Sequence, residues 1–442
     1  MNQKPLDMSA IIEENPLGKF QQLVMLFCAL IIIFDGFDVL AIAFAAPDLS
    51  KALEIANSDL GYVFAAGLFG MMLGALILGP VGDKYGRRNA VISSVCMFGL
   101  CTLLTGFIET YNELVLLRFL TGLGLGGALP NAMALMTEYV STRYRNIAIA
   151  VIFLGMPIGG ISGGIIASEI IPAYGWASLF YVGGVLPLLL VPVLILYLPE
   201  SPRFLVEHDN DNDKLLCKIA QKIESRREVP SNSVFYHHPV EKHFPVKALF
   251  MERRQADTLL IWVVFFFNLL VAYFLYSWIP TLLVEAGYQL SEATKTVIVL
   301  NIGGAISPFI LAKFISYWGS KRVLVVCFVL AGFSMMAVGQ FGSAINMVMI
   351  LSFFAGFFVV GGQVSLNALS SYMYPTHIRS TGVGWALGIG RIGSIVGPLL
   401  AGALVAASFG LDVNFIVFGS FCFVTATALF FIKNHEKVQD KS

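Results

Sequence analysis

Apolar positions along the chain gather into runs long enough to cross a lipid bilayer as helices, which takes about 20 residues each. Short polar turns separate these runs. There are twelve, near residues 20–46, 58–80, 89–108, 112–139, 146–170, 176–198, 257–284, 294–315, 322–341, 345–372, 380–409 and 413–433. The pattern predicts an all-α membrane protein with twelve transmembrane helices.

Composition agrees with this pattern and adds an orientation. Of the 442 residues, 57% are hydrophobic and only 13% are charged, whereas soluble domains are about one quarter charged. Lys and Arg are concentrated in alternate loops, and Asp and Glu predominate in the others. By the positive-inside rule, both termini and the long central loop face the cytoplasm. We therefore predict a multi-pass protein of the cytoplasmic (inner) membrane, embedded in a lipid bilayer.

A polar segment divides the twelve runs into six and six. It gives an N-terminal six-helix bundle at residues 1–202, a central cytoplasmic loop at 203–255 and a C-terminal six-helix bundle at 256–442. The halves also resemble one another: residues 138–164 align without gaps with residues 372–398, which pairs Arg145 with Arg379 and Gly159 with Gly393. Duplicated halves are typical of transporters in which one half rocks against the other around a midplane site.

The turn between the second and third runs reads GPVGDKYGRR, from Gly79 to Arg88. It places an acid at Asp83, a tight turn at Gly86 and two cations at Arg87 and Arg88 on the predicted cytoplasmic side. We expect Asp83 to join a charge network with neighbouring helix ends, which opens and closes during transport. The alternative is a basic turn that only sets the topology.

This turn resembles the loop 2–3 signature of the major facilitator superfamily, with Lys84 where an arginine is commonest. The sequence LPESPRFL at 198–205 and the glycines that follow Arg118 resemble that superfamily too. The resemblance covers the whole chain and implies the major facilitator fold, with two pseudo-symmetric six-helix bundles. In the second copy of the turn, SYWGSK at 316–321, Ser316 replaces the acid, so a gate there must work differently or depend on Lys321 and Arg322.

Four ionisable residues lie inside predicted spans: Asp35, Asp38, Arg118 and Arg391. Each costs about 2.5–3.5 kcal/mol at a span centre, and such residues usually face a bundle interior or a water-filled path. A helix rises about 1.5 Å per residue, which puts Asp38 roughly 12–15 Å and Arg118 roughly 9 Å below the outer surface, and Arg391 near the midplane. We expect Arg118 to meet Asp38 or, more distantly, Asp35. The alternative is that these charges only hold helices together.

Chemistry assigns different tasks to these charges. Two carboxylates one helical turn apart disfavour simultaneous ionisation, so one of Asp35 and Asp38 is suited to accept a proton. The guanidinium of Arg391 matches the geometry of a carboxylate, which favours an anionic substrate. Asp35, nearer the midplane, is our first choice for the proton carrier.

Asp35-Gly36-Phe37-Asp38 in the first span, together with the stretch at 374–398 that contains Arg391, narrows the resemblance to the aromatic acid:proton symporter family. The resemblance implies uptake of a benzoate, 4-hydroxybenzoate or protocatechuate-like acid. It implies proton coupling at Asp35 and Asp38 and a role in transport of the carboxylate for Arg118 and Arg391. The charges that match the family at cytoplasmic helix ends, with the turn residues, form the candidate gate: Asp83, Gly86, Arg87, Arg88, Glu138, Arg145 and Arg379.

Polar amides in later spans are candidates to bind a substrate hydroxyl, although each could cap a neighbouring helix instead: Asn268, Asn301, Gln363 and Asn367. The sequence GLGLGG at 122–127 lies inside a span, where glycines favour close helix packing over nucleotide binding.

Other function classes lack support in the sequence. There is no Walker A, H-E-x-x-H or nucleophile-elbow sequence and no C-x-x-C pair, so we predict no enzyme, cofactor or metal site. Net charge is zero, which indicates no nucleic-acid partner. We predict a monomer whose partners are a small organic acid anion and protons. Alternatives that stay open are a proton symporter of a non-aromatic acid or a sugar, a drug effluxer, and a receptor without transport.

Overall fold

Twelve long helical stretches build the protein. The structure, a computed structural model, describes residues 6–208, 213–224, 235–236, 246–251 and 254–433. In this part of the chain, twelve helical stretches are long and apolar enough to span a membrane, as the sequence predicted. They are α2 (Lys19–Ala52), α3 (Leu60–Tyr85), α4 (Arg87–Thr105), α5 (Tyr111–Tyr139), α6 (Thr142–Tyr174), α7 (Ala177–Tyr197), α10 (Gln255–Glu285), α11 (Leu290–Trp318), α12 (Ser320–Gln340), α13 to α14 (Ile345–Ala355 and Gly361–Met373), α15 (Thr376–Ala406) and α16 (Leu411–Phe431).

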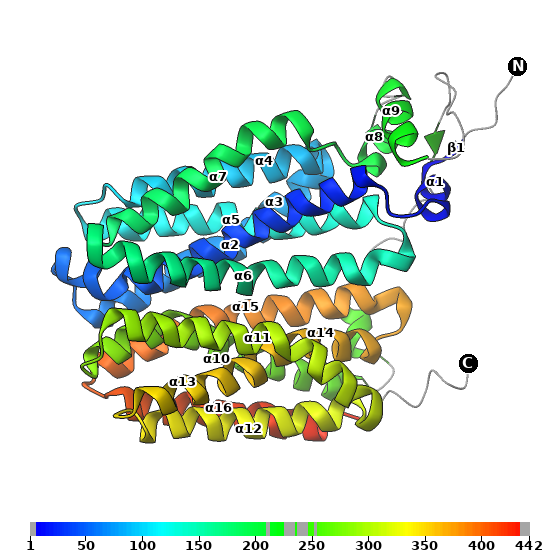
Figure 1. The fold of residues 1–442 in the computed structure, drawn as a ribbon. Coiled ribbons are helices and arrows are strands. Elements are labelled where there is room, and N and C mark those ends of the chain that lie inside the picture. Colours follow the sequence, from blue (N-terminus) through cyan, green and yellow to red (C-terminus); the bar gives the residue numbers. More distant parts are fainter. Residues whose placement is uncertain (1–5, 209–212, 225–234, 237–245, 252–253, 434–442) are drawn as a thin grey trace, which may run out of the picture.

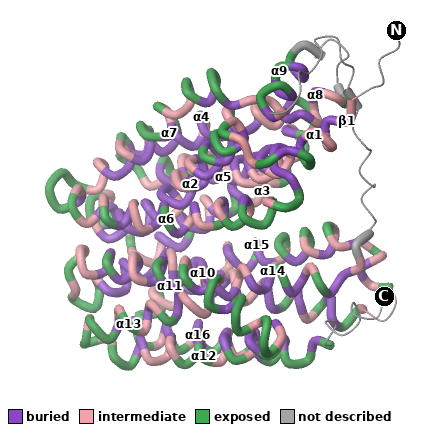
Figure 2. The backbone as a smooth tube through the Cα atoms, turned by 45° about the vertical axis from the view of Figure 1, so that its right-hand side comes forward, coloured by how far each residue is buried: buried purple, intermediate pink, exposed green. Residues whose placement is uncertain are grey.

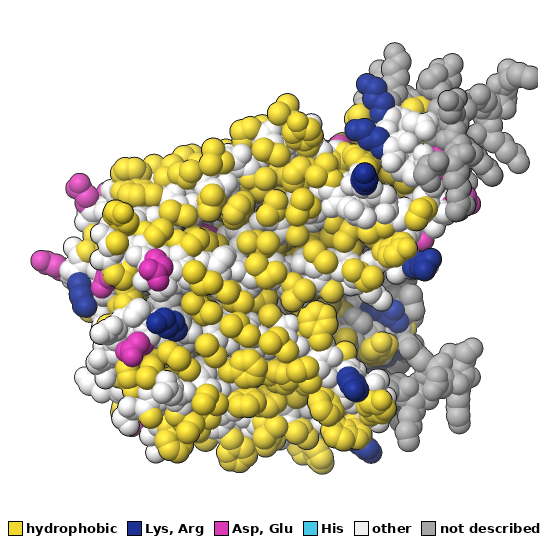
Figure 3. All heavy atoms as spheres, in the orientation of Figure 1, with side chains coloured by type: hydrophobic (Ala, Val, Ile, Leu, Met, Phe, Trp, Pro, Cys, Tyr) yellow, Lys and Arg dark blue, Asp and Glu magenta, His cyan; other side chains and the backbone are white. Residues whose placement is uncertain are grey.

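The helices form two bundles that lie side by side, α2 to α7 and α10 to α16 (Figure 1). Buried residues run along the interior of both bundles (Figure 2). On the face drawn in Figure 3, hydrophobic side chains cover the middle of the molecule and charged ones lie toward its two ends, as a membrane-spanning surface requires. We call the end that holds the short helices α1 (Met8–Glu14), α8 (Pro202–His208) and α9 (Asp213–Ile223) the α1 end, and the opposite end the η1 end, after the turn η1 (Asn57–Asp59).

The predicted internal repeat appears as equivalent helix contacts. A Cβ built on Gly159 in α6 would lie 2.1 Å from the carbonyl oxygen of Ile33 in α2. A Cβ built on the aligned Gly393 in α15 would lie 2.1 Å from the carbonyl oxygen of Phe266 in α10. Only a residue without a side chain permits such an approach. The first and fifth long helices of each half therefore meet backbone to backbone at matching positions.

The glycines of GLGLGG are packing positions, as predicted. A Cβ at Gly122 would lie 1.9 Å from the carbonyl oxygen of Gly67, and one at Gly126 would lie 2.1 Å from that of Met71. Small residues at such spacing let transmembrane helices approach closely. The α3–α5 contact includes the backbone of Arg118, in α5, whose carbonyl oxygen would lie 3.5 Å from a Cβ at Gly67.

The span that runs from Ile345 to Met373 is not a regular α-helix throughout. A π-helical turn, η4 (Gly356–Val360), separates α13 from α14. Such turns are rare and are frequent at functional sites. The hydrophobic pattern did not predict it, because one wide turn leaves the apolar run unbroken.

Among the described residues, the large hydrophobic cluster that both halves share includes the η1 end. It joins Phe44 and Phe64 of the first half to Trp278 and Leu300 of the second. Toward the α1 end the two main clusters are separate, one built between Met8 and Ile223 and the other between Leu249 and Ile432. The described residues thus pack the halves together at the η1 end and leave them less connected at the α1 end.

Direct contacts close the η1 end. The Asn57 side-chain amide donates a hydrogen bond to Glu285 Oε1 across the halves at 2.5 Å. The rings of Phe64 and Trp278 meet edge to face at 5.8 Å. A Cβ at Gly61 in α3 would lie 2.9 Å from the carbonyl oxygen of Pro398 in α15. This end is a tight seam between the bundles.

Short elements at the α1 end attach to one half or the other. The strand β1 (Leu6–Asp7) pairs in parallel with β2 (Phe235–Tyr236), and the core at this end of the first half includes side chains of α1 and α9. The Glu13 carboxylate accepts hydrogen bonds from the Thr142 backbone N–H at 2.9 Å and from its hydroxyl. By contrast, η3 (Val246–Phe250) packs on the second half. The exact domain boundaries at 202 and 256 stay a prediction.

Candidate functional site

The charge pair expected from helix depth is present. Asp38 on α2 and Arg118 on α5 are 2% and 3% exposed, and Arg118 Nη1 lies 3.5 Å from Asp38 Oδ2. The hydroxyl of Thr102, on α4, donates a hydrogen bond to Asp38. A buried charge needs both a counter-charge and hydrogen bonds to offset its desolvation, and Asp38 has both.

Arg118 is held by its neighbours as well as by Asp38. Its Nη2 donates to the hydroxyl of Thr105 at 2.6 Å and to that of Thr121 at 3.2 Å. The guanidinium also lies over the Phe180 ring, 5.2 Å from the ring centroid. With these partners, Arg118 has little capacity left for a substrate carboxylate, although its Nε has no hydrogen-bond partner.

Asp35 is in a different situation. It is 2% exposed, and its Oδ1 has no hydrogen-bond partner. The positive charge of Arg391 and the negative charge of Asp38 both act on it. A buried carboxylate without hydrogen bonds is costly to keep ionised. The structure therefore separates the two aspartates into one that is paired and one that is under-satisfied.

Arg391 on α15 reaches across both halves. Its Nη1 donates to the Tyr273 hydroxyl of α10 at 3.1 Å and contacts the Met71 sulfur of α3 at 3.0 Å. Among the residues that the structure describes, Arg391 makes no ion pair. Its partners are a phenol and a thioether, both weak acceptors beside a carboxylate. This guanidinium is therefore open to a better anionic partner.

A cavity of about 40 Å³ lies beside the Asp38–Arg118 pair, and the two residues that contact Arg391, Tyr273 and Met71, belong to its lining. Its polar lining is Asp38, Arg118, Thr121, Tyr273 and Ser277; its apolar lining is Val39, Ile42, Val63, Phe64, Gly67, Leu68, Met71, Gly122 and Leu125. The residues come from α2, α3 and α5 of the first half and from α10 of the second. A concave apolar wall with a few convergent polar groups is typical of a small-molecule site.

The candidate amides divide into two groups. Asn268 on α10 donates to the Gln363 side chain on α14, and Gln363 donates in turn to Asn367 at 3.2 Å. Asn268 is buried and its Oδ1 has no hydrogen-bond partner. Asn301 does not join this chain: its amide donates to the Val297 carbonyl of its own helix, and it lies beside Gly160 at the contact between the halves.

The turn after α3 forms the predicted kind of network. Arg87 lies 2.5 Å from Asp83 and 3.5 Å from Glu138 at the end of α5. Gly86 adopts a φ of +100°, which only glycine takes without strain, and a Cβ there would lie 2.3 Å from Glu200 Oε2. The Glu200 carboxylate accepts from the Arg88 backbone N–H at 3.0 Å. Five of the seven candidate gate residues therefore converge at the α1 end of the first half: Asp83, Gly86, Arg87, Arg88 and Glu138.

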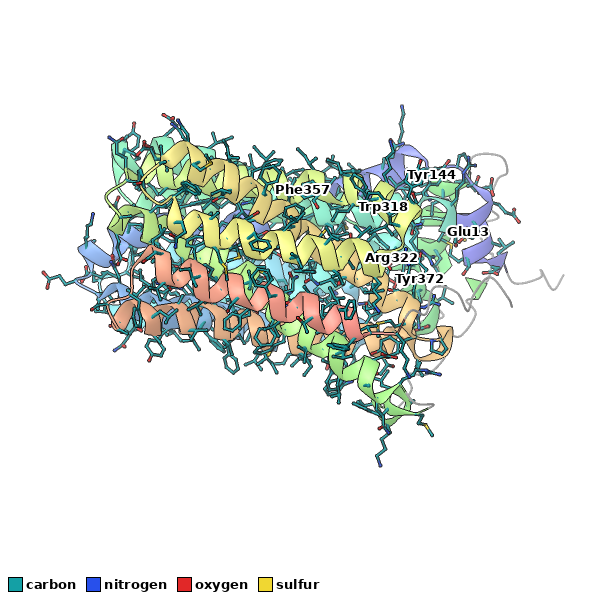
Figure 4. All side chains as sticks on the ribbon, turned by 90° about the horizontal axis from the view of Figure 1, so that it is seen from below. Glu13, Tyr144, Trp318, Arg322, Phe357 and Tyr372 are labelled. Carbon is teal, nitrogen blue, oxygen red and sulfur yellow. The ribbon has the colours of Figure 1, made fainter. Side chains whose placement is uncertain are left out.

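The second copy of the turn makes a related but simpler contact. Arg88 donates to the Leu198 carbonyl just past the end of α7 at 2.7 Å. Lys321, at the equivalent position in SYWGSK, donates to the Ile432 carbonyl just past the end of α16 at 2.5 Å. Figure 4 places Arg322 and Trp318 of this second turn at the same end as Glu13. Lys321 thus covers a helix end as Arg88 does. Whether a gate at the second turn works differently or depends on Lys321 and Arg322 stays a prediction.

Two candidate gate residues stay outside the network. Arg145 is exposed and takes part in none of the ion pairs of the described residues. Arg379 is half-buried, and its Nε has no hydrogen-bond partner. Sequence alignment pairs these two arginines, and neither reaches the Arg87 network. Their proposed part in gating stays a prediction.

Several residues of the site were not predicted. Thr102, Thr105 and Phe180 surround the Asp38–Arg118 pair, Tyr273 and Met71 contact Arg391, and Glu200 supports the turn at Gly86. Glu200 lies within LPESPRFL. The sequence predicts this acid on the same side of the membrane as the basic turn at 79–88, and that was a signal from which the contact could have been predicted. The hydroxyls and Met71 carry no such signal, because their roles depend on helix rotation.

Comparisons with known proteins agree with the fold. The Major Facilitator Superfamily profile matches residues 26–318 and 296–442. The chain is 35% identical to the gallate transporter of Pseudomonas putida over 425 residues, covering 96% of this chain and 94% of that protein. It is 38% identical to the 4-hydroxybenzoate transporter of Pseudomonas putida over 415 residues, covering 93% and 91% of the two chains.

A solved structure gives the same result for the architecture. The crystal structure of the D-xylose-proton symporter superposes with a TM-score of 0.72 at 15% identity, covering 93% of this chain and 98% of that one. At such low identity the likeness concerns the fold alone. Together with the profile and the two relatives, it shows that this chain belongs to the Major Facilitator Superfamily.

Proposed function

We propose that the protein is a proton-coupled secondary transporter that imports a small aromatic carboxylate by alternating access. The observation that carries the proposal is Arg391, a guanidinium without an ion pair among the described residues, close enough to the unsatisfied Asp35 for its charge to act there. The relatives named for gallate and 4-hydroxybenzoate support an aromatic acid as substrate.

The substrate would bind with its two ends in different surroundings. Its carboxylate pairs with Arg391, because a charge-assisted hydrogen bond is about twice as strong as a neutral one. Its ring lies against the apolar wall that contains Phe64, Leu68 and Met71. Ring hydroxyls reach the amides of Asn268, Gln363 and Asn367 as the helices move. This arrangement selects an anion with a flat apolar body.

Proton coupling follows from the neighbouring charges. While Arg391 is free, its positive charge stabilises ionised Asp35. A bound substrate carboxylate neutralises that charge, so Asp35 loses its support and takes up a proton. The loaded site then carries one cation balanced by one anion, with Asp35 neutral. Protonation of Asp35 removes the net negative charge that the bound anion would otherwise add, which lowers the cost of enclosing the loaded site while the halves rock around it.

The conformation corresponds to one step of this cycle. We place the α1 end in the cytoplasm of a cell with an inner membrane, on the distribution of Lys and Arg between loops. The η1 end is then outside and closed, so the molecule faces inward. A water needs about 10–15 Å³ by this measure, so the 40 Å³ cavity holds about three waters and an aromatic acid requires the helices to separate. Both halves belong to one chain, so a monomer suffices.

Uptake into proteoliposomes tests the proposal. Wild-type protein is expected to accumulate labelled 4-hydroxybenzoate when the outside is more acidic, and to exchange it in counterflow without a gradient. Asp35→Asn is expected to abolish the response to the pH gradient and to retain counterflow. The matched control is Asp48→Asn on the same helix, near the η1 end. Among the described residues, the ion pair of Asp48 is with Lys51, at 4.0 Å.

Competition distinguishes the substrate classes. Benzoate and gallate are expected to inhibit uptake, whereas succinate and xylose are not. Inhibition by xylose alone would favour a sugar symporter, and binding without counterflow would favour a receptor. An Asp35→Asn variant that still responds fully to the pH gradient would refute the assignment of the proton to Asp35.

A further inference from the structure

We infer that Tyr273 is a second carboxylate-binding residue, which donates its hydroxyl proton to the substrate while Arg391 provides the positive charge. The inference rests on the proposed function and deepens it. Tyr273 lies on α10, is 6% exposed and is one of the residues that line the cavity. Its hydroxyl accepts a hydrogen bond from Arg391 at 3.1 Å. Sequence patterns gave no reason to single it out from the other aromatics of its helix.

The hydrogen-bond inventory of the hydroxyl carries the argument. A phenol has one donor proton and can accept as well. The acceptor side of Tyr273 is used by Arg391, and no acceptor for its proton is found in the part of the chain that the structure describes. A buried polar group left unpaired costs free energy. The proton is therefore available to a ligand that binds at Arg391.

Geometry directs that proton toward the same ligand. A carboxylate has two oxygens with about four acceptor positions. An oxygen near Arg391 Nη1 also lies near Tyr273 Oη, since those two atoms are 3.1 Å apart. The second contact of Nη1, the Met71 sulfur at 3.0 Å, is a weak acceptor that a carboxylate oxygen displaces readily. The pair thus offers two donors of different kinds to one anionic group.

Tyr276 provides a matched control. It lies one turn along α10, and its ring meets that of Tyr273 edge to face at 6.0 Å. In the described part of the chain, the hydroxyl of Tyr276 makes no hydrogen bond with Arg391. Tyr273→Phe and Tyr276→Phe each remove one oxygen from adjacent rings. A general effect on packing would appear in both variants, whereas loss of a carboxylate donor would appear in Tyr273→Phe alone.

Uptake kinetics of labelled 4-hydroxybenzoate test the inference. Tyr273→Phe is expected to raise KM about tenfold, the lower range for a hydrogen bond to a charged group, with the maximal rate and the pH profile little changed. Tyr276→Phe is expected to keep the wild-type KM. A KM for Tyr273→Phe within twofold of wild type, or an equal rise in both variants, would overturn the inference.

Fluorination of the Tyr273 ring distinguishes two roles of its hydroxyl: donating a hydrogen bond to the substrate, or only positioning Arg391 by accepting one. At an assay pH low enough to keep the phenol protonated, a 3,5-difluorotyrosine at position 273 has a hydroxyl that is a stronger donor and a weaker acceptor. If the proton goes to the substrate, KM falls; if Tyr273 only accepts from Arg391, KM rises, and an unchanged KM also contradicts the proposal. This variant keeps the tyrosine shape and serves if Tyr273→Phe does not fold. Failure of wild-type protein to transport any aromatic acid would instead refute the proposed function.

Discussion

At the scale of single residues, the site contains two pairs of opposite charges in different states. Asp38 and Arg118 contact each other and are further held by Thr102, Thr105 and Thr121. Asp35 and Arg391 act on one another through their charges, and no ion pair joins them in the described part of the chain. A pair in direct contact with several supporting hydrogen bonds is suited to hold helices together, whereas a loose pair can respond to a substrate.

The satisfied pair predicts a stability effect. Asp38→Asn leaves the Arg118 guanidinium buried without a counter-charge, and we expect a loss of about 3–5 kcal/mol, the usual cost of breaking a buried ion pair. The loss is measured as the thermal unfolding of purified protein in detergent. Adding Arg118→Gln to Asp38→Asn removes the stranded charge and is expected to restore part of the stability. A double variant less stable than the single one would contradict this explanation.

Depth along a helix could be predicted from the sequence, and this is why the meeting of Asp38 with Arg118 was expected. A constant rise per residue fixes how far each side chain lies below the membrane surface. It does not fix the rotation of one helix against another. The contacts of Arg391 with Tyr273 and Met71 depend on that rotation, so sequence reasoning did not find them.

At the scale of helices, the matching glycines show how each half is assembled. Gly159 and Gly393 let the fifth long helix of each half touch the first through its backbone. The first helices carry three of the polar residues of the site, Asp35 and Asp38 on α2 and Tyr273 on α10. Each fifth helix therefore supports the helix that carries site residues.

Alanine substitutions test this support. Gly159→Ala and Gly393→Ala are each expected to destabilise the protein by about 1–3 kcal/mol, as overpacking usually does, because the new Cβ meets a carbonyl oxygen. Gly384→Ala on α15 is the control, since nothing lies within 4 Å of its Cβ. There we expect a gain of about 0.5–1 kcal/mol from the helix propensity of alanine. Thermal unfolding of the three variants gives the comparison; a stable Gly393→Ala would contradict the proposed contact.

Helix ends were the least predictable feature of the elements. The first apolar run ends near residue 46, yet α2 continues to Ala52. Likewise α3 extends to Tyr85, beyond the run that ends near residue 80. Hydrophobicity marks where lipid contact stops, whereas the backbone hydrogen-bond ladder continues into the polar layer until a residue such as Gly86 stops it.

At the scale of the whole molecule, the halves meet closely at the η1 end and each keeps a separate core at the α1 end. Alternating access requires the contact at the η1 end to break when the molecule opens on that side. The hydrogen bond between Asn57 and Glu285 crosses that contact.

A reversible cross-link tests the movement. In a background in which the exposed Cys96 is replaced by Ser, Asn57→Cys and Glu285→Cys are joined by a short disulfide-containing bifunctional reagent. The linked protein is expected to lose at least about nine tenths of its uptake, because the η1 end cannot open, and reduction is expected to restore it. Asn57→Cys alone, treated with the same reagent, is the control. Full uptake by the linked protein would show that this end stays closed throughout transport.

The placement of Trp278 has a spectroscopic consequence. Its indole N–H donates to the Pro398 carbonyl at 3.1 Å within its own half, while its ring meets Phe64 of the other half. When the halves part at the η1 end, Phe64 leaves and water takes its place, so the tryptophan emission shifts to longer wavelength. With the other four tryptophans replaced by phenylalanine, the protein would carry its own fluorescent reporter of outward opening, readable in real time as substrate and protons are added.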